Sequence, residues 1–100
     1  MNGTAWQKVD MNIPSHLTIG PHVYRVVLKD PGRMRYGTVN YQTCVIKIRP
    51  HATQQAHTFW HELTHAILHE MHRDDLARDE GFVSDFGRLL HRAIKTASFA

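Results

Sequence analysis

The chain has 100 residues, enough for one domain with a single core. Its 12 Lys and Arg against nine Asp and Glu give a net charge of +3 with His neutral, and the cations form no long block, so nucleic acid is not an expected partner. One cysteine excludes an internal disulfide, and no segment is long and apolar enough for a signal peptide or a membrane span, which predicts a cytoplasmic protein without a membrane partner.

The predicted elements follow an N-terminal lead-in at residues 1–14, and residues 15–100 are expected to form one domain. A run rich in valine and tyrosine predicts a strand over 22–28, which a Pro-Gly turn ends. Residues 35–41 and 43–49 then predict an antiparallel pair of strands, one face of which meets the helices.

Two helices are predicted next, over residues 53–72 and 76–97, the first with Thr53 as its N-cap. In the first helix we expect a buried apolar stripe on one side and a row of histidines on the other. The stripe comprises Ala56, Trp60, Leu63, Ile67 and Met71, and the histidines are His61, His65, His69 and His72. The predicted fold class is α+β, a small antiparallel sheet of about three strands packed on two helices.

Residues 61–65 read His-Glu-Leu-Thr-His within the first predicted helix. Residues four apart lie on one face of a helix, about 6 Å apart along its axis, so His61 and His65 can direct their imidazoles at one ion. This is the HExxH zinc signature, in which the two histidines bind the metal and Glu62 acts as a general base on a metal-activated water. The alternative is a surface helix that is rich in histidine and binds no metal.

A catalytic zinc site usually has three protein ligands. Met71 stands where the metzincin pattern requires a third histidine, which excludes that class. His69 lies about 12 Å along the helix axis from His61, so we expect it to be solvated or to lie on the substrate side. Glu80, at the edge of the apolar arc of the second helix, is the preferred third ligand. Asp79 is its rival, with helix capping as its other expected role.

The run His61-Glu62-Leu63-Thr64-His65-Ala66-Ile67-Leu68-His69, followed by Glu80, Val83 and Phe86, resembles the small zincin peptidases of the ImmA/IrrE type. The likeness covers about residues 35–95, and HExxH is its specific part. It implies a minimal zincin-like metallopeptidase domain with a gluzincin-like site, in which His61, His65 and Glu80 hold Zn²⁺ and Glu62 is the base. It also implies a protein or peptide substrate, such as a repressor, bound beside an edge strand at 36–41. Because many such proteins are phage-encoded, the implied location is then the host cytoplasm.

The predicted function is therefore zinc-dependent hydrolysis of peptide bonds. A further donor is expected to stabilise the oxyanion, and the sequence leaves six candidates open: Tyr24, Tyr36, Tyr41, His69, His72 and His91. Two alternatives remain. One is a zinc-binding regulatory or interaction protein with little turnover, and the other is a nucleic-acid-associated factor suggested by the isoelectric point of about 9.4. Nitrogen and oxygen ligands also suit cobalt, nickel or manganese, and the substrate and oligomeric state do not follow from the sequence.

Overall fold

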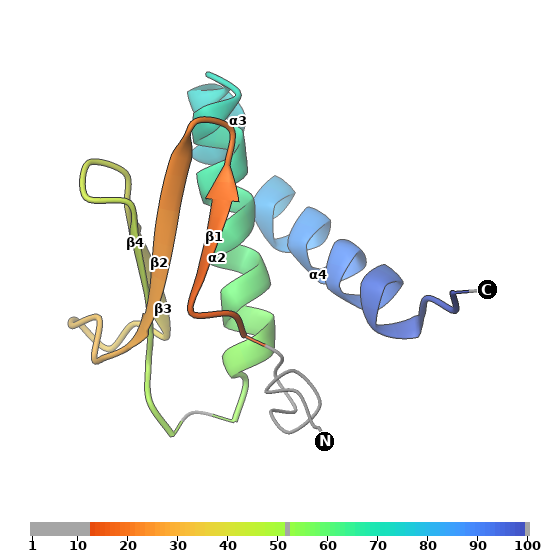
Figure 1. Cartoon of the computed structure of the whole chain (residues 1–100), viewed down its shortest axis with the longest axis horizontal. Helices are drawn as coiled ribbons and strands as arrows, with labels where there is room; N and C mark the ends of the chain where they lie inside the picture. Colours follow the sequence, from red (N-terminus) through yellow and green to blue (C-terminus); the bar gives the residue numbers. More distant parts are fainter. Residues whose placement is uncertain (1–12, 52, 100) are drawn as a thin grey trace.

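The structure, a computed structural model, describes residues 13–51 and 53–99. The strands are β1 (His16–Ile19), β2 (His22–Leu28), β3 (Gly37–Asn40) and β4 (Val45–Ile48), and the helices are α2 (Gln55–Glu70), α3 (Asp74–Ala77) and α4 (Glu80–Thr96). Figure 1 shows α2 lying along the sheet and α4 on the far side of α2. The predicted α+β class is confirmed, whereas residues 1–12 of the predicted lead-in lie outside the described residues.

The sheet differs from the prediction in strand number and direction. The described residues form four strands in the order β1-β2-β4-β3, where the sequence predicts about three, all antiparallel. β3 and β4 do pair antiparallel, but β2 and β4 pair parallel, with Val26 opposite Ile46. After β2 the chain forms β3 at the edge of the sheet. It then returns as β4, which lies between β2 and β3. The prediction missed this order because side-chain alternation reports which face is buried and not which strand is the neighbour.

The missed strand, β1, forms a hairpin with β2. Ile19 pairs with His22, so Gly20 and Pro21 alone make the turn. Gly20 has a φ of 58°, which glycine adopts without a Cβ penalty. A Gly-Pro pair between alternating apolar residues is a hairpin signal that the sequence did contain.

The core lies between the sheet and α2. Phe59, Leu63 and Ala66 of α2 are buried against Tyr24, Val26, Ile46 and Ile48 of the sheet. The predicted stripe is confirmed in part: Leu63 is buried and Trp60 and Ile67 are partly buried against the core, whereas Ala56 is only partly covered and Met71 is wrong, at 57% exposed. The face that meets the sheet is rotated from that stripe because α4 covers a second side of α2.

The predicted helix over 76–97 is two helices. One turn forms α3, and α4 begins at Glu80 because the Asp79 side chain caps it, accepting a hydrogen bond from Phe82 N at 3.0 Å. Only Val83 and Gly87 of α4 are buried. The last turns of α4 extend beyond α2 in Figure 1. Within the described residues, no helix is both long and apolar enough to cross a membrane.

α2 is shorter at both ends than the predicted helix over 53–72. Its N-cap is Gln54, not Thr53, and Gln54 makes no side-chain cap hydrogen bond. At the other end His72 has a φ of 61°, and Arg73 N donates to Leu68 O at 2.9 Å. This hydrogen bond from Arg73 N to Leu68 O is that of a Schellman motif, which ends many helices.

Candidate metal and catalytic site

The two motif histidines lie one turn apart on α2, as the i, i+4 spacing predicts. Their ring centroids are 5.0 Å apart, and the ring planes are inclined at 69°. His65 is buried and His61 is partly buried. Burial and the neighbouring His65 lower the pKa of His61, although Glu80 opposes this. Near neutral pH His61 is therefore neutral, which is the form that binds metals.

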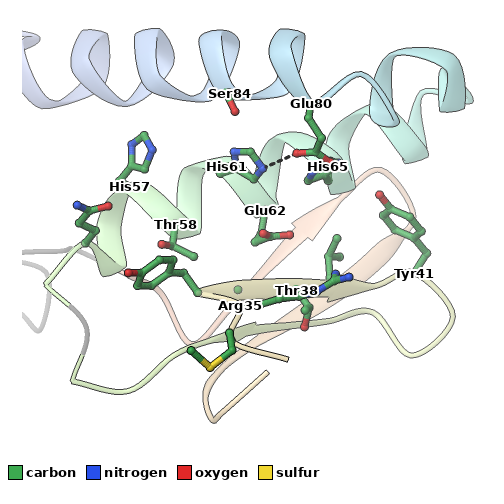
Figure 2. A pocket seen from close by; sticks show the side chains of 15 residues that line it. Arg35, Thr38, Tyr41, His57, Thr58, His61, Glu62, His65, Glu80 and Ser84 are labelled. Atoms are coloured by element: carbon green, nitrogen blue, oxygen red, sulfur yellow. Dashed lines mark hydrogen bonds and ion pairs between the residues drawn. The ribbon is translucent and has the colours of Figure 1, made fainter. Parts of the chain in front are cut away.

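Helix α4 brings Glu80 to this pair of rings. Glu80 Oε1 lies 3.1 Å from His61 Nε2, and Glu80 Oε2 lies 3.2 Å from His65 Nε2. Figure 2 shows the carboxylate reaching down from α4 to the two rings. Asp79, the rival ligand, is occupied as the N-cap of α4.

Gly87 is the reason that α4 can lie so close to α2. A Cβ at this position would lie 3.1 Å from Trp60 O, 3.2 Å from Thr64 Oγ1 and 3.3 Å from His61 Cα. These distances are shorter than ordinary van der Waals contact, and two of the three neighbours are backbone atoms that cannot rotate away. A larger residue would push α4, and Glu80 with it, away from the histidines.

The donor set of His61, His65 and Glu80 fits zinc. One ligand atom from each residue lies within 4.8 Å of the others. At a zinc–ligand bond of about 2.0–2.1 Å, two ligands of a tetrahedral site are about 3.4 Å apart. Both carboxylate-to-imidazole distances are within a few tenths of an ångström of this spacing. Two imidazole nitrogens and one carboxylate also match the ligands of known catalytic zinc sites.

Glu62 projects into the space between α2 and β3 (Figure 2). Its side chain is buried, and burial together with the negative charge of Glu80 raises its pKa to about 7, against the opposing charge of Arg35. Gly37 of β3 allows this packing, because a Cβ there would lie 2.5 Å from Thr58 Cγ2 and 3.1 Å from Glu62 Cγ. The strand backbone thus runs directly beside the carboxyl group.

A cleft of about 730 Å³ contains all four predicted site residues. One wall is formed by α2 and the start of α4, and the other by residues 34–41, including β3. Arg35, His57 and Thr58 also line the cleft and were not predicted from the sequence. His57 carries a usable signal, since it precedes His61 by one helical turn, but Arg35 reaches the cleft only through the fold.

The residues predicted as candidate oxyanion donors lie in different parts of the structure. Tyr36 and Tyr41 line the cleft. Tyr24 is fully buried elsewhere and donates to Glu70 Oε2 at 2.8 Å, and His91 stacks on Trp60 with 5.7 Å between ring centroids.

Three comparisons with known proteins gave no match: no family model, no curated protein and no solved structure is significantly similar to this chain.

Proposed function

We propose that the protein is a zinc-dependent metallopeptidase. The observation that carries the proposal is the convergence of His61, His65 and Glu80 beside the buried Glu62, at the base of one cleft. Glu80 lies at a distance from each histidine that suits a shared zinc ion, and the HExxH motif supplies the two histidines and Glu62 together. The resemblance to ImmA/IrrE peptidases extends the proposal to a regulatory protein as substrate and to a cytoplasmic location.

A bound zinc ion would acidify a water molecule and polarise the carbonyl group of the substrate. The remaining steps belong to the chain. Glu62 accepts the proton released as the peptide carbonyl is attacked and passes it to the leaving amine. A carboxyl with a pKa of about 7 is suited to both transfers near neutral pH, because it neither holds nor loses its proton strongly there.

The position of β3 supports an extended peptide as the substrate. β3 is an edge strand of the sheet and pairs only with β4 within it, so its other side is available for backbone pairing. β3 residues 37–39 line the cleft opposite His61 and Glu62. A peptide added to this edge would present its carbonyl groups to Glu62 and to the proposed metal ligands.

Zinc content and cleavage test the proposal separately. We expect purified wild-type protein to hold one zinc per chain by elemental analysis and to cleave protein substrates in a proteome-wide screen. Glu62→Gln should retain zinc and lose cleavage, because it removes the proton acceptor and no ligand. Glu80→Gln should lose zinc affinity, whereas the matched variant Asp79→Asn, which preserves a capping side chain, should not. Wild-type protein that stays metal-free in excess zinc would refute the assignment.

A second candidate is a zinc-binding interaction protein without turnover. The exposed apolar side chains Phe86, Leu89 and Ile94 along α4 favour it, because they offer a surface for another protein. Glu62→Gln separates the two candidates: biological activity that persists in this variant would indicate binding, and its loss would indicate catalysis.

A further inference from the structure

The turn between β3 and β4 holds Tyr41 in a defined position. Asn40 Oδ1 accepts hydrogen bonds from Gln42 N at 2.9 Å and from Thr43 N at 3.0 Å. Cys44 Sγ donates to Tyr41 O at 3.6 Å, which closes the turn. The backbone that carries the Tyr41 ring is therefore fixed by contacts within the turn itself.

The ring is fixed a second time from the helices. It stacks on His69 of α2, with 4.0 Å between ring centroids and 9° between planes. His69 Nδ1 lies 3.1 Å from Asp74 Oδ1 at the start of α3, so the histidine is itself held in place. His69, itself held by Asp74, thus clamps a phenol that belongs to the opposite wall of the cleft.

The Tyr41 hydroxyl points across the cleft towards the side where His65 and Glu80 lie (Figure 2). Burial and the negative charges of Glu62, Asp74 and Glu80 raise the pKa of Tyr41. The phenol therefore keeps its proton and is a hydrogen-bond donor throughout the physiological range. Tyr41 lines the same cleft as Glu62 and Glu80.

The other candidate donors are less well placed. Tyr24 is bonded to Glu70 in the core, and His91 stacks on Trp60 away from the cleft. Tyr36 lines the cleft but is 60% exposed, so its hydroxyl is not aimed by packing. Preorganisation of the donor is what gives an oxyanion site its effect, because no reorganisation is then needed during the reaction.

We propose that Tyr41 donates a hydrogen bond to the carbonyl oxygen of the scissile peptide as negative charge develops there, with His69 and Asp74 as its positioning residues. This inference rests on the proposed peptidase function. No proton leaves the phenol, and no bond to Tyr41 forms or breaks. The tyrosine stabilises the transition state more than the bound substrate, so its loss reduces kcat rather than raising KM.

The test uses zinc-loaded full-length protein and two probes. Fluorescein-labelled β-casein reports kcat and KM, and phosphoramidon, a phosphoryl dipeptide with a tetrahedral anionic group, reports oxyanion binding by titration calorimetry. Tyr41→Phe should lower kcat by about 100-fold and change KM by no more than about twofold. It should weaken phosphoramidon binding while zinc content and thermal stability stay close to wild type. Tyr36→Phe, which removes the other phenol in the cleft, is the matched comparison.

The clamp is tested by a double-mutant cycle. His69→Ala should lower kcat, and His69→Phe, which keeps a stacking ring, should restore part of it. Tyr41→Phe combined with His69→Ala should be no worse than Tyr41→Phe alone, because His69 acts on catalysis only by positioning the Tyr41 hydroxyl, which Tyr41→Phe has already removed. A purely structural role for His69 would instead give additive losses.

Each remaining outcome decides the question. Full kcat in Tyr41→Phe, or an equal or larger loss in Tyr36→Phe, overturns the assignment to Tyr41. If the wild type binds zinc and phosphoramidon but does not cleave casein, the prediction that the protein is a peptidase acting on casein is wrong. The Tyr41 proposal is then decided by whether Tyr41→Phe weakens phosphoramidon binding. Wild-type protein that neither cleaves casein nor binds phosphoramidon overturns both proposals.

Discussion

Replacing Glu62 with glutamine should stabilise the zinc-free protein at alkaline pH. The native carboxyl is buried between α2 and β3, close to the negative charge of Glu80, and its pKa is raised from 4.5 to about 7. Glutamine has nearly the same shape and carries no charge, so it removes the cost of ionising a group in this position.

The direction of the effect follows from proton binding in the two states. As the pH rises, the unfolded chain loses the Glu62 proton near 4.5, whereas the folded chain keeps it until about 7. Between these values the folded state binds more protons, so the stability of the wild type falls as pH increases. Above pH 7 the accumulated cost is about 3 kcal/mol, and at pH 5 it is under about 1 kcal/mol.

Urea unfolding followed by circular dichroism, on EDTA-treated protein from pH 5 to 8.5, measures this difference. The advantage of Glu62→Gln over wild type should grow across the range and level off above pH 7. Glu70→Gln is the control. Hydrogen bonds from His22 and Tyr24 lower the pKa of Glu70 below 4.5, so its stabilising contribution is present above that value and Glu70→Gln should destabilise, opposite in sign to Glu62→Gln. A Glu62→Gln advantage that is absent at pH 8, or equal at pH 5 and 8, would refute the reasoning.

Three further predictions concern stability. Gly87→Ala should destabilise by about 1 kcal/mol, because crowding of about 1–3 kcal/mol against Trp60 and His61 exceeds a helix-propensity gain of about 1 kcal/mol. Gly81→Ala in the same helix, where the new Cβ makes only an ordinary contact, should stabilise by up to about 1 kcal/mol, and equal melting shifts for both would contradict this. His72→Gly should raise the melting temperature, since the exposed His72 holds a φ of 61° that costs a non-glycine residue about 1 kcal/mol, whereas His72→Ala should bring no such gain. Asp79→Ala should cost about 1 kcal/mol through the lost cap, and Asp79→Asn should restore most of it in thermal melts.

Local patterns predicted the parts of this protein that depend on neighbours in sequence. The strand His22–Leu28 was predicted at its observed bounds, because it is rich in β-branched and aromatic residues and a Pro-Gly turn follows it. The approach of His61 and His65 is likewise a property of one helical turn. Asp79 and Glu80 were both named from the helical wheel, and the structure separates them: Asp79 caps α4 and Glu80 reaches the histidines.

The remaining features depend on contacts that are distant in sequence. The parallel pairing of β2 with β4 joins strands between which β3 lies in the sequence. The buried face of α2 is rotated towards Phe59, and this rotation depends on where α4 packs. The position of α4 depends in turn on Gly87, which has no side chain to hold the two helices apart. Arg35 enters the cleft from a loop whose position no periodicity encodes.

The two walls of the cleft come from separate stretches of the chain, residues 34–41 on one side and residues 54–84 on the other. Substitutions in the first stretch can therefore change what the cleft accepts while His61, His65 and Glu80, the proposed metal ligands, keep their geometry. Gly37 is the exception, because any side chain there would collide with Thr58 and Glu62. Residues of the first stretch other than Gly37 are therefore free to change the ligand preference of the cleft, whereas Gly37 is fixed by its contacts with Thr58 and Glu62.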